Sequence, residues 1–439
     1  MYFKNSLTVG IYTLGCKVNQ YESEAIAEEL EKNGAKIMPC STVCDAYIIN
    51  TCTVTAESDR KARQFIRRAI SKNADAYIIV TGCMAQTSPE DIAAIDGVDC
   101  IIGNTDKLSV VTALTELATK GRKNSDTEII VKDIDNCGFE EMSISRFDRT
   151  RAYVKIEDGC ENRCTYCIIP SARGKVRSKS PDLVIKEVEQ LVAGGCREVV
   201  LTGIETASYG RDLGNVDLAD LLCRVDKIRG IGRVRLGSLD PSLIRPDFVK
   251  KISSLSCLAP HFHLSLQSGS DKVLAAMKRK YNSKMAMRAI ELLRESIPNV
   301  KFTTDVIVGF PGESEDDFCQ TEEFVSNAGF LTVHIFPYSK RKGTLASQMS
   351  GQISSEIKSE RLHRLEKVAS ESQKAILSDA VCGAPIRRVL FETYSDGYAL
   401  GHTDDFIEVA VPSPEPLRAE LLNVKLLSTD GKMCFGELT

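Results

Sequence analysis

The chain has 439 residues, of which 43% are hydrophobic and 26% are charged, a balance typical of globular proteins. A chain of this length predicts about two or three domains. It has no run of about 18 apolar residues, and the polar residues within Met1–Thr8 argue against a secretory signal, so we expect a cytoplasmic protein without a membrane partner. The net charge of -4 gives no support for DNA binding, and any nucleic-acid contact must come from local basic patches.

Sixteen cysteines are many for a chain with this expected location. Disulfide frameworks are typical of small secreted domains, and a reducing compartment disfavours them. We therefore expect some of the cysteines to bind a metal or a cluster. Others, such as Cys223 and Cys257 within apolar stretches, are interpreted as small buried hydrophobic side chains.

Apolar runs and helical patterns alternate between residue 8 and about residue 135. Strand-like runs cover Thr8–Leu14, Tyr47–Asn50 and Ala76–Thr81. Helical patterns cover Glu22–Lys32 and Glu57–Ser71. This alternation predicts an open parallel α/β sheet covered by helices.

Cys16, Cys52 and Cys83 each come just after one of these strand-like runs. Parallel strands end at the same edge of a sheet, and ligands bind at that edge. We therefore expect the three thiols to converge, with three unrelated buried thiols as the alternative interpretation.

A second unit is predicted from Arg151 onward, with six strands separated by helices. Six β/α repeats with right-handed crossovers predict a partial (β/α)6 barrel, whose functional residues lie at the carboxyl ends of its strands. The expected strands are Ala152–Glu157, Glu198–Gly203, Arg233–Ser238, Phe262–Gln267, Phe302–Gly309 and Leu331–Phe336. The expected helices include Pro181–Ala193, Pro246–Ser254, Lys284–Arg294 and Glu315–Asn327.

The remaining chain is predicted to form one long polar helix, Ile353–Ala380, followed by five short strands. Five short strands in fewer than 60 residues predict a small antiparallel β-barrel. The fold class is thus α/β with this added barrel, and the expected domains are residues 1-142, 146-375 and 382-439. The five strands are Arg387–Glu392, Tyr398–His402, Ile407–Val411, Asn423–Ser428 and Met433–Glu437.

Cys160, Cys164 and Cys167 directly follow the first predicted barrel strand, with the spacing C-x3-C-x2-C. Closed structural zinc sites and fully protein-ligated clusters use four protein ligands rather than three. Three thiolates would leave one iron of a [4Fe–4S] cluster open to a small molecule. Zinc is the alternative, although the next cysteine along the chain is Cys196, beyond a predicted helix.

This cysteine triplet after a strand resembles the signature of the radical S-adenosylmethionine superfamily. The resemblance implies that the open iron binds S-adenosylmethionine and that one electron cleaves this cofactor to a 5′-deoxyadenosyl radical. It also implies cofactor contacts near the cluster loop and the strand ends, where each residue alone is equally typical of a turn. The expected contact residues are Tyr166, Gly203, Glu205, Gln267, Ser268 and Gly309.

Six stretches resemble the methylthiotransferase family within this superfamily, and they span nearly the whole chain. The resemblance implies a second [4Fe–4S] cluster on Cys16, Cys52 and Cys83, which handles the sulfur. It assigns no catalytic residue beyond the cluster ligands. The six stretches are Thr13–Ser23, Asn50–Val54, Thr81–Gln86, His263–Ser270, Thr304–Glu313 and Phe336–Thr344.

The residues beside Cys16 bear on the substrate. Lys17 and Val18 stand where the isopentenyladenosine enzymes tend to carry glutamine and methionine. The chain therefore resembles more closely the enzymes that form 2-methylthio-N6-threonylcarbamoyladenosine next to the anticodon of tRNA. Methylthiolation of isopentenyladenosine or of a ribosomal protein aspartate is an alternative, and a non-catalytic metal-containing RNA-binding protein is a more distant one.

The predicted final barrel resembles the TRAM domain, with which family members bind RNA. Residues 382–439 carry only five basic against nine acidic residues, whereas RNA affinity depends on lysine and arginine. We therefore also expect RNA contacts from basic patches elsewhere, for which a solvated face is the alternative. The family further implies a low-potential electron donor of the flavodoxin or ferredoxin type. The expected RNA-binding residues are Arg173, Lys175, Arg177, Lys340, Arg341 and Lys342.

Overall fold

The structure is a computed structural model that describes residues 7–120, 126–147 and 149–439. It divides into two compact units, each formed by segments that are far apart in sequence. No helix among the described residues is long and apolar enough to cross a membrane. The first unit comprises Met1–Ile144, Tyr153–Lys179 and Ser339–Ser347, and the second comprises Ser145–Ala152, Ser180–Tyr338 and Gln348–Thr439.

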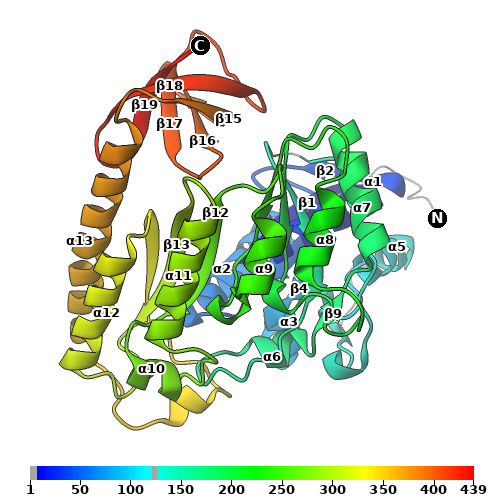
Figure 1. The fold of residues 1–439 in the computed structure, drawn as a ribbon. Helices are drawn as coiled ribbons and strands as arrows, with labels where there is room; N and C mark the ends of the chain where they lie inside the picture. The colour runs from blue at the N-terminus through cyan, green and yellow to red at the C-terminus, as the bar shows by residue number, and fades with distance from the viewer. Residues whose placement is uncertain (1–6, 121–125, 148) are drawn as a thin grey trace. The chain divides into compact units, whose positions relative to one another are not determined.

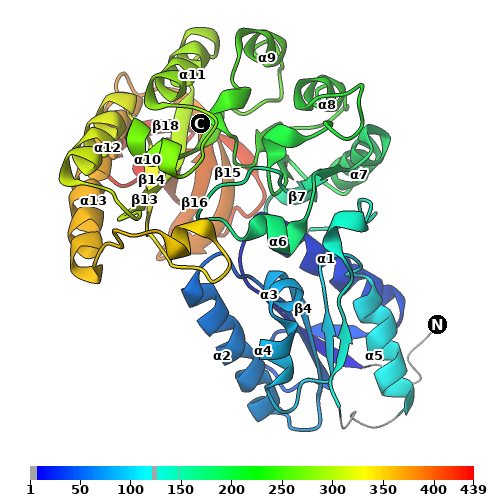
Figure 2. The ribbon, with the colours of Figure 1, turned by 90° about the horizontal axis from the view of Figure 1, so that it is seen from below.

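The amino-terminal part of the first unit is a parallel sheet with strand order β2-β1-β3-β4-β5-β6, and helices lie along it (Figure 2). Strand β3 is buried at all six positions, as expected for a parallel strand that is covered on both faces. The predicted open α/β sheet is therefore confirmed. Its strands are β1 (Thr8–Thr13), β2 (Lys36–Met38), β3 (Ala46–Thr51), β4 (Tyr77–Gly82), β5 (Cys100–Ile102) and β6 (Glu128–Ile130).

The helices of this part are α1 (Lys17–Lys32), α2 (Ala56–Lys72), α3 (Cys83–Thr87), α4 (Pro89–Ala93) and α5 (Ser109–Lys120). Helix α1 begins at Lys17, so the predicted start at Glu22 is wrong. Its buried stripe already starts at Val18 and continues through Tyr21, because residues three and four apart share one face of a helix.

A short hairpin in the first unit carries the second set of cysteines. The strands β8 (Glu157–Asp158) and β9 (Arg177–Ser178) pair in antiparallel fashion and close the loop between them. That loop contains helix α6 (Ile169–Arg173) and follows strand β7 (Ala152–Lys155). The antiparallel pair therefore fixes both ends of the cysteine loop.

The second unit contains parallel β/α repeats, and Figure 2 shows helices α7, α8, α9, α11 and α12 in an arc outside the strands. Strand β10 pairs with β11, and β12 with β13 and β13 with β14, all in parallel. Together with β7 these are the six predicted barrel strands, so the partial barrel is confirmed. The strands are β10 (Glu198–Thr202), β11 (Arg233–Leu236), β12 (His261–Gln267), β13 (Lys301–Val308) and β14 (Thr332–Pro337). The helices are α7 (Pro181–Ala193), α8 (Leu218–Val225), α9 (Pro246–Ile252), α10 (Asp271–Ala276), α11 (Ser283–Ser296) and α12 (Glu315–Ala328).

The carboxyl-terminal part of the second unit is helix α13 (Ser355–Ala380) followed by a closed five-stranded barrel (Figure 1). The barrel order is β15-β16-β17-β19-β18, and only the β17–β19 pair is parallel. Its core includes Val389, Phe391 and Val409, all fully buried. The predicted small barrel is confirmed, with strands β15 (Ile386–Ser395), β16 (Tyr398–Thr403), β17 (Glu408–Pro412), β18 (Leu421–Thr429) and β19 (Cys434–Leu438).

Candidate active site

Cys16, Cys52 and Cys83 follow the carboxyl ends of three neighbouring strands, since β3 pairs with both β1 and β4. Cys16 caps the start of α1, Cys52 directly follows β3, and Cys83 is the first residue of α3. Burial, followed by the nearby thiols of Cys83 and Cys16, raises the pKa of Cys52 to about 11. The structure therefore brings these three thiols close enough to interact.

Gly82 lets the chain turn from β4 into Cys83. Its φ is 100°, a left-handed conformation that favours glycine, and a Cβ there would lie 2.4 Å from the carbonyl oxygen of Thr51. Any side chain at this position would push β4 away from β3 and move the Cys83 thiol.

An iron–sulfur cluster fits this donor set. Iron binds cysteine as the thiolate, and the bound iron cations supply the positive charge that stabilises this form. Arg173 adds a further positive group, because its Nε donates a hydrogen bond to the Cys83 Sγ at 3.3 Å. Three sulfur ligands leave one iron of a cubane cluster without a protein ligand.

Cys160, Cys164 and Cys167 lie on the loop that β8 and β9 close. Cys160 and Cys164 are buried, whereas Cys167 is partly exposed. The Cys160 amide donates to the Gly174 carbonyl at 2.9 Å, and the Cys167 amide donates to the Cys164 carbonyl at 3.1 Å. This donor set also fits a three-ligand cluster, and its backbone bonds hold the loop in a compact turn.

A buried network of charges surrounds Glu22, which is fully buried on the inner face of α1. Lys107 Nζ, Lys155 Nζ and Arg173 Nη1 lie 2.5, 2.7 and 2.5 Å from its carboxylate oxygens. Asp158 accepts from Lys155 at 2.6 Å and from Arg173 at 3.2 Å. Burial alone would raise the pKa of Glu22, but the three cations hold it well below its ordinary value.

This network links the two cysteine sets within the first unit. Arg173 donates to Cys83 of the first set and pairs with Asp158, which stands two residues before Cys160 of the second set. Glu22 lies on helix α1 and Lys107 just before helix α5, both in the part of the unit that contains the sheet, whereas Asp158 lies on β8 and Arg173 on α6 of the cysteine loop. Because unpaired buried charges are costly, these pairs hold the loop and the sheet in one arrangement.

Three arginines that the sequence assigns to RNA contacts are instead engaged inside the first unit. Arg173 is fully buried, and Arg177 is only 7% exposed, with a hydrogen bond to the Ile134 carbonyl. Arg341 lies 2.6 Å from Asp59 and 2.7 Å from the hydroxyl of Thr53. The RNA prediction is corrected for these three, because their guanidinium groups satisfy internal partners. Of the predicted set, Lys175, Lys340 and Lys342 are exposed.

The residues expected to contact S-adenosylmethionine stand at strand ends or in the cysteine loop. Gly203 and Glu205 follow β10 and are half-buried, and Tyr166 in the loop is also half-buried. Gln267 ends β12 with a φ of 70°, a conformation that side chains rarely adopt and that is often found at functional sites. Gly309 follows β13 and also has a positive φ.

Ser268 and Glu313 have structural partners that the motifs do not reveal. Ser268 is fully buried, with its hydroxyl 3.2 Å from that of Thr321. Glu313 accepts from the Gly309 amide at 2.6 Å and from Arg361 at 2.6 Å. The turn after β13 is therefore held by a buried ion pair to helix α13.

Sequence reasoning missed the role of Glu22 and its partners. One signal was present in the sequence: Glu22 stands four residues after Val18 and four before Ile26, on the apolar stripe of a helix. A carboxylate on such a stripe requires buried cations.

Comparisons with known proteins define the class first. Residues 154–325 match the family described as the Radical SAM superfamily, and residues 8–103 match Uncharacterized protein family UPF0004. The fold is similar to the radical S-adenosylmethionine methyltransferase TsrM from Kitasatospora setae. The TM-score is 0.59 at 15% identity, over 79% of this chain and 77% of that chain. The protein therefore has the fold of a radical S-adenosylmethionine enzyme.

Relatives then define the family. The chain is 39% identical to the threonylcarbamoyladenosine tRNA methylthiotransferase MtaB of Bacillus subtilis, over 96% of this chain and 94% of that protein. MtaB of Thermotoga maritima is also 39% identical, over 97% of this chain and 96% of that protein. The tRNA-2-methylthio-N(6)-dimethylallyladenosine synthase of Caldicellulosiruptor saccharolyticus is 34% identical, over 100% of this chain and 94% of that protein. This chain belongs to the MtaB-like methylthiotransferases of the radical S-adenosylmethionine superfamily, enzymes that use S-adenosylmethionine and an iron–sulfur cluster.

Proposed function

We propose that this enzyme attaches a methylthio group to C2 of N6-threonylcarbamoyladenosine next to the anticodon of tRNA, using two [4Fe–4S] clusters. The observation that carries the two-cluster proposal is the presence of two three-cysteine sets in one compact unit, with Arg173 bonded between them. The 39% identity to two proteins named for this substrate supports the choice of nucleoside. Relatives named for dimethylallyladenosine reach 34%, so that nucleoside is the second candidate.

In this proposal Cys160, Cys164 and Cys167 hold the cluster that binds S-adenosylmethionine. The other three cysteines, Cys16, Cys52 and Cys83, hold the auxiliary cluster. When bound, the clusters and S-adenosylmethionine supply the radical, the methyl group and the sulfur. The aryl C–H bond at C2 offers no acidic proton, so the proposal needs no side chain that acts as a general base.

The protein's own residues position these groups. Arg173, held by Glu22 and Asp158, donates to the Cys83 sulfur and fixes the side chain of that ligand. Glu205 stands at the end of β10 and is proposed to receive the amino group of S-adenosylmethionine. Tyr166, Gly203, Gln267, Ser268 and Gly309 are proposed to line the rest of the cofactor site, with Ser268 acting through the turn that it stabilises.

RNA binding is proposed for the exposed members of the predicted basic set, Lys175, Lys340 and Lys342. Their ammonium groups face solvent, where phosphate neutralisation contributes most to affinity. The acidic residues of the carboxyl-terminal barrel outnumber its basic ones, so its overall charge does not favour RNA. The barrel is therefore proposed to contact RNA through one local face only.

The proposal also needs a low-potential electron donor of the flavodoxin or ferredoxin type. A surface hollow of about 370 Å³ is lined by Cys160, by the exposed cations Arg163 and Lys175 and by the exposed acids Asp135 and Glu161. Cys160 brings the proposed cluster near this surface, and the mixed charges offer a carrier polar partners of both signs. A tRNA substrate and such a donor both support a cytoplasmic location.

The test is an anaerobic reaction of the cluster-loaded enzyme with S-adenosylmethionine, reductant and tRNA that lacks methylthio groups. Mass spectrometry of the digested nucleosides should find 2-methylthio-N6-threonylcarbamoyladenosine. The same group on dimethylallyladenosine would favour the second candidate. S-adenosylmethionine cleavage without either nucleoside would contradict a tRNA substrate.

A further inference from the structure

Three potential metal ligands lie together in the second unit, and none of them is a cysteine. His263, Asp305 and His334 stand on the adjacent parallel strands β12, β13 and β14. Their ligand atoms all lie within 4.8 Å of one another. His263 Nε2 is 3.1 Å from Asp305 Oδ2, and His334 is the direct ladder neighbour of Asp305.

The three side chains share the face of the strands that the outer helices do not cover. Phe262 and Phe302 are buried on the opposite face, where Arg294 of α11 lies 5.4 Å from the Phe302 ring centroid. Side chains alternate along a strand, so His263 and Asp305 point the other way. The side chains of His263 and Asp305 are 14% and 29% exposed, and His334 is exposed, so an ion can reach them from this inner face.

Thr303 fixes the orientation of the His263 ring. Its Oγ1 lies 2.9 Å from His263 Nδ1 and 3.1 Å from His261 Nε2. This oxygen can accept the Nδ1–H of His263 while donating its own proton to His261. Metal-binding histidines commonly donate their second N–H to such an oxygen, which leaves Nε2 for the metal.

We propose that His263, Asp305 and His334 bind one divalent transition-metal ion. Two imidazoles and one carboxylate suit zinc or ferrous iron, whose bonds to such ligands are about 2.0–2.2 Å long. Ligand atoms around one such ion lie about 3 Å apart, which is already the separation between His263 and Asp305.

Three protein ligands leave at least one coordination position open towards the inner face of the strands. Sites of this type take a water molecule or an oxygen of a bound molecule, whereas closed structural sites use four protein ligands. This metal site uses none of the six proposed cluster ligands and none of the proposed cofactor contacts. The metal-site proposal can therefore be tested independently of the proposed function.

The test uses the full-length enzyme with its iron–sulfur content intact, equilibrated with Zn²⁺ under anaerobic conditions and then dialysed. Zinc and iron are counted for wild type, His334→Ala and Asp305→Asn, with His363→Ala as the matched control. His363 is exposed on α13, its Nδ1 lies 3.1 Å from Glu366, and it is not one of the three ligands. We expect wild type and the control to hold about one zinc ion more per chain than the other two variants, at equal iron.

Zinc K-edge X-ray absorption of the wild-type protein provides a readout that thiol binding cannot imitate. We expect nitrogen scattering from imidazole in wild type and its loss in His334→Ala. Equal zinc in all four proteins would overturn the proposal. A zinc shell of sulfur alone would also overturn it, because the ion would then sit on cysteines.

Discussion

Arg173 links Cys83 of the first cysteine set to Asp158, which stands two residues before the second set. Its Nε donates a hydrogen bond to the Cys83 sulfur at 3.3 Å, and its Nη1 forms ion pairs with Glu22 and Asp158. Hydrogen bonds to ligating sulfur tune the reduction potential of a cluster, since they stabilise its more negative reduced state. In the proposed two-cluster enzyme, the buried guanidinium would therefore act on the auxiliary cluster through its hydrogen bond as well as its charge.

The first prediction concerns this hydrogen bond. Arg173→Lys keeps a positive charge beside Glu22 but removes the Nε donor, so the reduction potential of the auxiliary cluster should fall. A potentiometric titration followed by electron paramagnetic resonance measures it, with Lys175→Ala, two residues further and exposed, as the control. An unchanged potential in Arg173→Lys would contradict a tuning role.

The second prediction concerns the charge balance around Glu22. Glu22→Gln leaves Lys107, Lys155 and Arg173 without their shared carboxylate in a buried site. Breaking a buried pair in this way should cost about 3–5 kcal/mol in the free energy of unfolding. Urea denaturation measures the loss, and Glu29→Gln, at an exposed pair with Lys32 on the same helix, should cost less than about 1 kcal/mol. Equal costs for the two variants would refute the network.

The same residues show where sequence reasoning stops. Arg173 lies in a run of basic residues that is typical of a surface patch, yet its carboxylate partner Glu22 is 151 positions away. Local charge patterns cannot reveal such a partner. Likewise, His263 and His334 are 71 positions apart in the sequence, with Asp305 between them. Only strand pairing brings the three residues together. By contrast, Cys16, Cys52 and Cys83 each follow a parallel strand, and Cys160, Cys164 and Cys167 share one short loop, so both groupings could be predicted.

Among the helices of the second unit, the long periodic ones were predicted, and of the short ones only α9 was. Helix α7 (Pro181–Ala193) has the predicted bounds, whereas α8 with eight residues and α10 with six were not predicted. Helical periodicity needs about 11–18 residues to stand out from chance. Short helices between strands depend on packing, which sequence patterns do not show.

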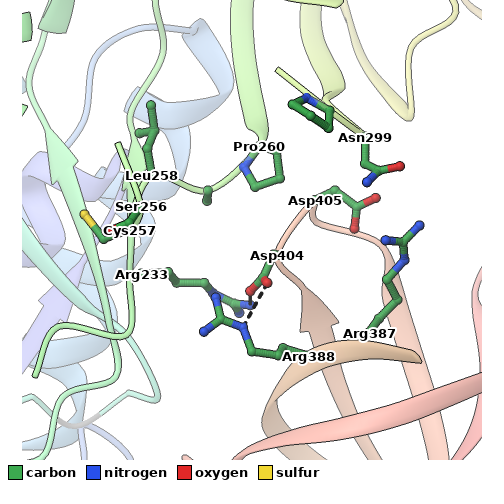
Figure 3. Close-up of a pocket in the computed structure, with 12 residues that line it drawn as sticks. Arg233, Ser256, Cys257, Leu258, Pro260, Asn299, Arg387, Arg388, Asp404 and Asp405 are labelled. Carbon is green, nitrogen blue, oxygen red and sulfur yellow. Dashed lines mark hydrogen bonds and ion pairs between the residues drawn. The ribbon is translucent and has the colours of Figure 1, made fainter. Parts of the chain in front are cut away.

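The junction between β10, β11 and the carboxyl-terminal barrel is held by ion pairs within the second unit. Glu198, at the start of β10, is fully buried beside Arg235 Nε at 2.8 Å and also pairs with Arg233. Arg233 in turn reaches Asp404 of the barrel, and Figure 3 shows Arg388 also paired with Asp404. Burial would raise the pKa of Glu198, but the arginines lower it to about 2.

The third prediction follows from this shift. A carboxylate whose folded pKa is lowered contributes stability above its unfolded pKa of about 4.5, and the contribution is lost as the pH falls towards about 2. Between about pH 6 and about pH 3, wild type should lose about 2 kcal/mol more stability than Glu198→Gln. Urea denaturation at the two pH values measures this difference. The pH-dependent contributions of all other carboxylates are common to both proteins and cancel in it. The same loss in both proteins would contradict the ionised state of buried Glu198.

At the scale of the whole molecule, each compact unit combines segments far apart in sequence. Residues 339–347 belong to the first unit although they follow the last barrel strand, and Arg341 pairs there with Asp59. Sequence order alone does not reveal such an arrangement. The domain boundaries at 142, 146, 375 and 382 stay a prediction.

The fourth prediction concerns the RNA surface. The double variant Lys340→Ala/Lys342→Ala should bind tRNA more weakly and with a smaller dependence on salt. Each lost phosphate contact lowers the slope of log K against log salt by about 0.7–0.9. Filter binding across a salt series measures the slope, with exposed Lys367→Ala on α13 as the control. Parallel slopes for the double variant and wild type would exclude these lysines from the interface.

The central claim is that two independent three-cysteine sites each hold a [4Fe–4S] cluster. Anaerobic iron and sulfide analysis of wild type and of two triple alanine variants, one for each cysteine set, tests it most directly. We expect about eight irons in wild type and about four in each variant. Four irons in wild type, lost completely when Cys160, Cys164 and Cys167 are replaced and unaffected when Cys16, Cys52 and Cys83 are replaced, would contradict it.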